Sequence, residues 1–225
     1  APPDAFVSAL LDALGPRSTK TRSPWIARKQ EGPAAADAPS AASPATTDAI
    51  DPRLPLDDLA RVVTQTLAPH RPSYIRLPLG WPGEHCRFAH PLDYIGFDGG
   101  GSIGSGPGMA IGAALALRAG DRLPVAVVGD GDYLMGLTAL WTGVHYRIPV
   151  LIVIANNQSF FNDEIHQERM ARLRGRPVEN KWVGLRMDDP AIDLAQLARG
   201  QGARGYGPVR DANALRAALD DAVRD

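Results

Sequence analysis

Short β-branched runs alternate along the chain with longer segments whose apolar residues follow a helical period. Residues 125–128 form one such run, which ends at Gly129, and residues 150–155 form a second. Between them, residues 134–146 place their apolar side chains at helical spacing. Short apolar runs bounded by turn residues are typical of buried parallel strands. The order strand, helix, strand predicts a βαβ unit, whose crossover we expect to be right-handed.

The same patterns predict further elements on both sides of this unit. Helical periods occur at residues 4–14, 55–67, 107–117, 163–173, 190–198 and 212–223. Residues 73–77 show a further strand pattern, and residues 205–209 are a candidate strand end. Strands that alternate with helices indicate an α/β protein. We therefore expect a doubly wound, mostly parallel sheet with helices on both faces.

Composition limits the domain organisation and the classes of partner. The 225 residues, of which 44% are hydrophobic, suit one domain with appendages. Residues 19–49 are rich in Ala, Pro, Ser and Thr, which is typical of an extended linker or a surface strap. The formal net charge of −1 gives no indication of a nucleic-acid partner or an acidic membrane surface.

Cysteine usage and hydropathy limit the compartment and the redox chemistry. The single cysteine, Cys86, excludes a disulfide framework within the chain and a Cys-ligated iron–sulfur cluster. No apolar run approaches the roughly 18 residues of a membrane span, and the chain opens without a signal-peptide pattern. We therefore expect a cytoplasmic protein that does not span a membrane.

Polar side chains follow the two strands of the βαβ unit. Asp130 comes directly after the first strand, and Asn156 and Asn157 come after the second. Parallel strands end at the same edge of a sheet, and ligands of open α/β sheets bind outside that edge. Carboxylate, amide and carbonyl oxygens suit Mg²⁺ or Ca²⁺, and a glycine turn that opens a helix offers N–H groups to phosphates. The sequence therefore predicts a metal–diphosphate site.

The spacing of the two motifs is more specific than either motif alone. An isolated G-D-G is often an ordinary turn, but here 24 residues separate Gly129-Asp130-Gly131 from Asn156-Asn157. This pattern resembles the cofactor motif of thiamine diphosphate enzymes. The resemblance implies that Asp130, Asn157 and the carbonyl of Ser159 hold Mg²⁺. The cofactor-binding residues expected on this basis are Gly101, Ser102, Ile103, Gly129, Asp130, Gly131, Asp132, Asn157, Ser159 and Phe160.

A glycine-rich stretch at residues 99–112 is the second informative segment. A P-loop is excluded because no G-K-[ST] follows. A flexible glycine loop without a binding function is one interpretation of the stretch. The stretch also resembles the thiamine diphosphate enzyme segment in which a large aliphatic residue props the cofactor into a V shape. By that match Ile103 is the wedge. The carbonyl of Gly101 would accept from the cofactor's 4′-amino group, and the N–H of Ile103 would face its pyrimidine.

Acidic residues at the start of the helix predicted at 163–173 are candidate proton carriers. Relatives with decarboxylase activity often have an acidic residue about here, and Asp163 is the nearest match. Glu164 and His166 are the alternatives, and any of the three could relay a proton beside the reactive carbon. The competing interpretation is that Asp163 caps the helix and the other two lie on a solvated face. The sequence leaves both open.

Residues 51–225 look like the diphosphate-binding domain of the acetolactate synthase and benzoylformate decarboxylase group. Residues 1–14 resemble the tail of that group's middle domain, and residues 15–50 resemble the linker between domains. The resemblance implies decarboxylation or carboligation of a small 2-oxo acid by a homo- or hetero-oligomer.

The chain also departs from this group. Complete members carry a pyrimidine-binding domain whose glutamate activates the cofactor, and no glutamate here matches it. We therefore expect that domain on another chain and no activity from this chain alone. Asp132 stands where relatives often have a small residue, so it adds a negative charge near the phosphates.

Two other classes of function compete with this one. The chain could be an orphan, non-catalytic cofactor-binding or regulatory module, for which the missing glutamate domain is the supporting feature. It could also be a generic α/β nucleotide binder in which the two motifs coincide by chance. The absence of a G-x-G-x-x-G directly after a strand counts against a dinucleotide site.

Overall fold

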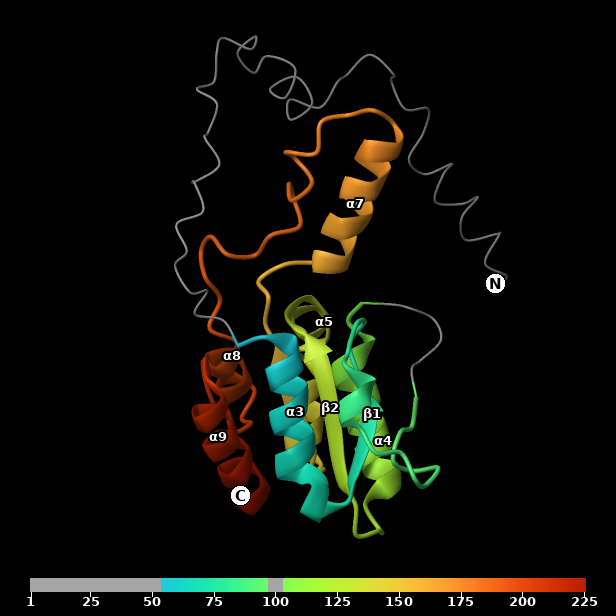
Figure 1. Cartoon of the computed structure of the whole chain (residues 1–225). Coiled ribbons are helices and arrows are strands. Elements are labelled where there is room, and N and C mark those ends of the chain that lie inside the picture. Colours follow the sequence, from blue (N-terminus) through green and yellow to red (C-terminus); the bar gives the residue numbers. More distant parts are fainter. Residues whose placement is uncertain (1–53, 97–102) are drawn as a thin grey trace, which may run out of the picture. The chain divides into compact units, whose positions relative to one another are not determined.

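The computed structural model describes residues 54–96 and 103–225, which belong to the unit Asp51–Asp225 (Figure 1). The predicted helix at 4–14 and the linker at 19–49 lie outside these residues. The described chain forms a three-stranded sheet in the order β1-β2-β3, and both strand pairs are parallel. The strands are β1 (Pro72–Arg76), β2 (Leu123–Gly129) and β3 (Leu151–Ala155). The predicted α/β fold with a parallel sheet is therefore confirmed.

The central strand β2 is buried on both faces, which explains its uninterrupted apolar sequence. Val125 and Val127 belong to one core cluster, whereas Ala126 and Val128 belong to a second. All four side chains have no exposed surface. Successive residues of a strand point to opposite faces, so a strand covered on both sides needs apolar residues at every position.

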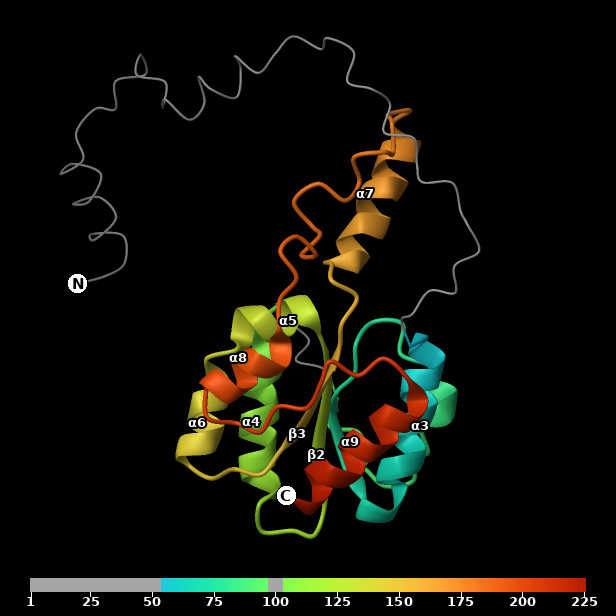
Figure 2. The same cartoon turned by 90° about the vertical axis from the view of Figure 1, so that its left-hand side faces the viewer.

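The first and last described helices cover one face of the sheet. Helix α3 (Leu56–Leu67) packs against α9 (Ala212–Arg224), and Figure 2 shows the two side by side. Val62, Val63 and Leu67 of α3 meet Leu215 and Leu219 of α9 in one cluster with Val125 and Val127. Their apolar positions follow the helical period, so each helix presents one apolar stripe to the sheet.

The crossover helices cover the other face. Helix α4 (Ser105–Leu117) joins β1 to β2, and α6 (Ala139–His145) lies between β2 and β3. Helix α8 (Leu194–Gly200) packs on the same side through Ala198. Gly143 of α6 approaches α4 so closely that a Cβ there would lie 2.4 Å from Ile111 Cδ1. The small residues of α4 and α6 therefore allow a close contact.

The remaining elements lie around the carboxyl ends of the strands or in the connections. Helix α5 (Asp130–Gly136) follows β2 directly. Helix α7 (Phe161–Leu173) follows β3 and stands beyond the strand ends in both views (Figures 1 and 2). Two short 3₁₀ turns are η1 (Ala68–His70) and η2 (Gly83–His85). No helix of the described residues is long and apolar enough to cross a membrane.

Three predicted elements need correction. The helix expected at 134–146 is divided into α5 and α6 by a turn at residues 137–138. The helix expected at 190–198 begins only at Leu194, where Asp193 caps it by accepting from the amide of Gln196. Residues 205–209 form no strand. The apolar period of a sequence does not predict such boundaries, because local caps and turns set where a helix begins and ends.

The central core provides a stability prediction. Leu67 is fully buried between α3, α9 and the sheet, so Leu67→Ala should lower the free energy of unfolding by about 2–5 kcal/mol through lost transfer energy and a cavity. Leu79 is 72% exposed, and Leu79→Ala should change it by about 0.5 kcal/mol or less. Urea unfolding followed by circular dichroism measures both. Equal effects would contradict this assignment of the core.

Candidate functional site

Asp130 lies at the carboxyl end of the central strand and is the first residue of α5. Its carboxylate is buried, with 3% of the residue exposed. One oxygen accepts from the amide of Gly131 at 3.0 Å, and the other accepts from the amide of Ser159 at 3.2 Å. Burial raises the pKa of Asp130 above its ordinary value, although the backbone hydrogen bonds act in the opposite direction. The buried carboxylate therefore favours a positive partner.

Asn157 is brought next to Asp130 by the register of the sheet. Gly129 pairs with Ala155, so β2 and β3 end at the same level. The side-chain oxygen of Asn157 accepts from the amide of Ser159 at 3.0 Å, which is the same amide that Asp130 accepts. A carboxylate and an amide oxygen thus converge on one N–H group. The predicted proximity of the two motifs is found in the structure.

The Ser159 segment is held from two sides. The hydroxyl of Ser159 donates to the buried Glu164 of α7. The amide of Phe160 donates to the carbonyl of Leu185 at 3.0 Å, and the amide of Met187 donates to the carbonyl of Gln158 at 2.8 Å. Residues 158–160 therefore pair with residues 185–187, which were not predicted to belong to the site. This pairing fixes the backbone on which the carbonyl of Ser159 lies.

The three candidate proton carriers occupy different environments on α7. Glu164 is 4% exposed and contacts Arg186, with Nε and Oε1 3.6 Å apart, in addition to Ser159. Asp163 is half-buried in the first turn, and His166 is exposed. The capping role considered for Asp163 is wrong, because Phe160 is the N-cap residue and no side chain caps this helix. The catalytic role of these residues stays a prediction.

Gly131 and Phe160 join the loops that follow β2 and β3. A Cβ on Gly131 would lie 2.4 Å from the ring of Phe160, so only glycine allows the ring to pack there. Gly131, the second glycine of the G-D-G motif, is therefore required by this aromatic contact. Phe160, which the sequence marked as a cofactor-binding residue, is half-buried at this contact.

The glycine-rich segment meets α5 at its described end. Gly101 and Ser102 lie outside the described residues, and Ile103 is 45% exposed immediately before α4. One carboxylate oxygen of Asp132 accepts from the amides of Gly104 and Gly106, at 2.6 and 3.2 Å. Its other oxygen lies 3.0 Å from Nε of Arg76. Arg76 was missed in the sequence, where its position at the end of β1 was the only signal.

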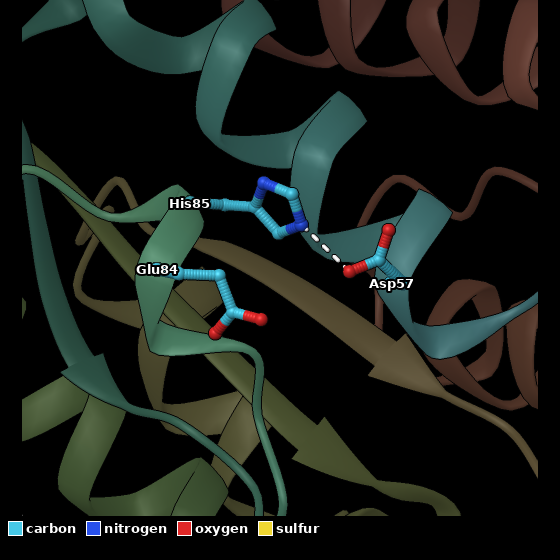
Figure 3. Close-up of side chains that lie close together, drawn as sticks. All are labelled: Asp57, Glu84 and His85. Atoms are coloured by element: carbon cyan, nitrogen blue, oxygen red, sulfur yellow. Dashed lines mark hydrogen bonds and ion pairs between the residues drawn. The ribbon is translucent and has the colours of Figure 1, made fainter.

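Two further features lie outside this cluster. Asp57, Glu84 and His85 are the one group of three potential metal-ligating side chains among residues 54–96 and 103–225 (Figure 3). His85 Nε2 lies 2.7 Å from the Asp57 carboxylate, and both carboxylates of the group are exposed, so a solvated hydrogen bond accounts for this contact. A cavity of about 580 Å³ opens beside Tyr74, Cys86 and Arg122. Neither feature shares a residue with the Asp130 cluster.

The fold and the site define an α/β cofactor-binding domain with oxygen donors at the carboxyl ends of its strands. The chain belongs to the thiamine pyrophosphate enzyme family, because the family model for the C-terminal TPP binding domain matches residues 79–225. It is 28% identical over 141 residues to the mitochondrial acetolactate synthase catalytic subunit of Aspergillus candidus. It is 29% identical over 119 residues to benzoylformate decarboxylase of Pseudomonas aeruginosa.

These matches cover part of each protein. They span 62% and 53% of this chain but only 19% and 20% of the two enzymes. Among solved structures, the thiamine diphosphate-dependent 4-hydroxybenzoylformate decarboxylase of Rhodococcus jostii RHA1 is similar with a TM-score of 0.64 and 28% identity. That match covers 78% of this chain and 31% of the decarboxylase chain. The described fold is thus that of a thiamine diphosphate-binding domain.

The buried carboxylate of Asp130 generates a pH prediction. Its pKa is raised from 3.8 in the folded chain, so the unfolded chain releases its proton first as the pH rises. Below about pH 3.8 the carboxyl is protonated in both states, so its burial does not lower the free energy of unfolding. As the pH rises through the raised pKa, the buried carboxyl ionises and the free energy of unfolding falls. Asp130→Asn should therefore stabilise the metal-free chain at pH 7, with a gain that disappears towards pH 3.8.

The measurement is the free energy of unfolding of both proteins in urea across this pH range, with EDTA and with excess Mg²⁺. Magnesium should reduce the difference at pH 7, because a cation compensates the ionised carboxylate of the wild type. A difference that does not depend on pH would contradict the assignment.

Proposed function

We propose that this chain supplies the metal- and diphosphate-binding half of a thiamine diphosphate enzyme that decarboxylates or ligates small 2-oxo acids. The observation that carries the proposal is the convergence of the buried Asp130 carboxylate and the Asn157 amide oxygen on the amide of Ser159. The names of two similar enzymes, benzoylformate decarboxylase and 4-hydroxybenzoylformate decarboxylase, support 2-oxo acids as the substrate class.

The donor set fits Mg²⁺. Asp130, Asn157 and the carbonyl of Ser159 would supply hard oxygen ligands, and Mg²⁺ commonly completes its octahedron with waters and substrate phosphates. Glu164 would not bind the metal itself but would support the Ser159 ligand, because it accepts a hydrogen bond from the Ser159 hydroxyl. The hydrogen bonds of Phe160 and Gln158 to residues 185–187 would keep the ligand backbone in place.

When bound, thiamine diphosphate supplies a nucleophilic carbon and an electron sink for reactions of 2-oxo acids. The residues of this chain would orient the cofactor and exclude water. Ile103 is the proposed wedge between the two rings, consistent with its partly exposed position ahead of α4. The carboxylate of Asp163 or the imidazole of His166 would carry a proton at the α7 end of the site. Glu164 is less suited to this role because Ser159 and Arg186 already engage it.

We further propose that a pyrimidine-binding domain outside these 225 residues, in the same polypeptide or in another, completes the site. The chain corresponds to about a fifth of the full enzymes that it resembles, and the activating glutamate of this group has no counterpart in it. An orphan cofactor-binding module without catalytic activity is the second candidate. The same donor set would then bind the cofactor for a regulatory or storage role.

The chain offers a matched pair of variants to test the metal assignment. Asn156 and Asn157 are both exposed, and each accepts from the amide two residues further on, at 3.0 Å. Asn157→Ala should weaken Mg²⁺-dependent binding of thiamine diphosphate by at least about tenfold. Loss of a group that only supports a metal ligand already costs about that much, and Asn157 is proposed as a ligand itself. Asn156→Ala should change it less than about twofold, because Asn156 is not one of the three proposed ligands, although it accepts from the amide of Gln158, which also hydrogen-bonds Asp130.

Isothermal titration calorimetry with thiamine diphosphate, in Mg²⁺ and in EDTA, measures this difference. Thermal unfolding of each variant without ligand controls for stability. Equal losses in the two variants, or binding that does not depend on Mg²⁺, would refute the ligand set.

The requirement for a second domain leads to an activity prediction. The purified chain should release no CO₂ from benzoylformate or pyruvate above the rate with Asp130→Ala. Addition of a pyrimidine-binding domain that co-purifies with it should raise the rate by at least about 10², given the contribution of general acid–base groups. The intact masses of all polypeptides in the preparation identify such a partner. Turnover by the lone chain would contradict the shared site, and cofactor binding without turnover in any preparation would favour the orphan module.

A further inference from the structure

Asp132 has a buried carboxylate that the metal assignment does not use. Its residue is 8% exposed, and its two oxygens take different partners. One oxygen accepts from the amides of Gly104 and Gly106 at the start of α4, and the other pairs with Arg76 at the end of β1. The Arg76 side chain is also buried and donates to the hydroxyl of Ser105 at 2.8 Å. Asp132 thus joins three separate segments at the carboxyl edge of the sheet.

The glycines around Asp132 pack so closely that no side chain would fit in their place. A Cβ on Gly106 would lie 2.3 Å from the carboxylate of Asp132 and 2.9 Å from Val128. Gly104 has a φ of +96°, and a Cβ there would lie 2.9 Å from Cβ of Met135. A Cβ on Gly136 would lie 2.3 Å from the carbonyl of Gly104. The residues before α4 and helix α5 therefore pack backbone against backbone around one buried ion pair.

We infer that Asp132 is a positioning residue that sets the place of Ile103. Ile103 directly precedes Gly104. The hydrogen bond from the amide of Gly104 is the shorter of the two that the Asp132 carboxylate accepts from this segment. Asp132 is also two residues beyond Asp130 on the same helix turn. One residue therefore links the metal-binding end of the site to the residue proposed to shape the cofactor's rings. This inference rests on the proposed function, because the role of Ile103 belongs to it.

Arg76 makes the burial of this carboxylate possible. A buried carboxylate without a cation is strongly disfavoured, and the guanidinium offers a fixed fork of donors. The pair is locally neutral, so the carboxylate can accept from the two glycine amides without adding an uncompensated charge beside the diphosphate. Arg76 and Asp132 consequently act as a unit, and the loss of either partner should release the Ile103 segment.

A second ion pair in the chain provides the matched control. Asp93 accepts from the amides of Ala89 and His90, at 2.7 and 2.8 Å, and pairs with Arg122. Arg122 in turn contacts Ser73 and Pro72 at the amino end of β1. This group has the same chemistry as the Asp132 group but lies at the opposite end of β1 and β2. Loss of its carboxylate tests the general cost of such a pair.

The experiment compares the wild type, Asp132→Ala and Asp93→Ala as full chains. Hydrogen exchange of the metal-free proteins should accelerate at residues 103–106 in Asp132→Ala only. Affinities for inorganic diphosphate and for thiamine diphosphate, both with Mg²⁺, then separate the two ends of the cofactor. Asp132→Ala should not weaken binding of inorganic diphosphate, since Asp132 is paired with Arg76 and is not one of the proposed metal ligands. It should weaken binding of thiamine diphosphate about tenfold, because the rings lose a preorganised contact.

Each result decides the inference. Unchanged exchange at residues 103–106, an unchanged ratio of the two affinities, or the same changes in Asp93→Ala would overturn it. If Asp132→Ala does not fold, Asp132→Asn carries the test, because it retains the volume and an acceptor and loses only the pairing with Arg76. A wild type that binds neither ligand would instead refute the proposed function, and this inference with it.

Discussion

A carboxylate buried at the carboxyl end of the central strand is the constraint around which the described chain is arranged. Asp130 has 3% of its surface exposed, and its oxygens accept from backbone amides of Gly131 and Ser159. Amides compensate a charge only in part, which is why burial still raises the pKa of Asp130. A divalent cation would complete the compensation. The energetic cost of this buried carboxylate and the metal binding proposed for it would therefore have one physical origin.

The loop after β3 follows from that constraint. The amide of Ser159 is shared by Asp130 and Asn157, and its hydroxyl is held by Glu164. The strand-like pairing of residues 158–160 with residues 185–187 adds backbone hydrogen bonds from a distant segment. Metal ligands need such support, because side chains and carbonyls that rotate freely lose affinity. Helix α7 contributes to the candidate site through Glu164, which accepts from the hydroxyl of Ser159.

Glycines allow the second half of the arrangement. Gly104, Gly106 and Gly136 bring the start of α4 against α5 at distances that exclude a Cβ. The ion pair of Arg76 and Asp132 lies inside this contact and ties both helices to β1. An acidic residue directly beyond the G-D-G motif is thus accommodated by a cation from the neighbouring strand. Its charge is neutralised within the fold and need not oppose a bound diphosphate.

The sequence by itself determined the sheet and the location of the site. Strands buried on both faces require continuous apolar runs, and parallel strands must end at one edge, so the positions of Asp130 and Asn157 followed from hydrophobicity and spacing. The apolar pattern did not show the division of the helix at 134–146 or the absence of a strand at 205–209, and the late start of α8 follows from a local cap by Asp193. The pattern also did not show the partners of Asp132 and Glu164, which pair with Arg76 and Arg186. Buried polar groups take their partners from whichever segment the fold brings near, and only the tertiary structure decides which segment that is.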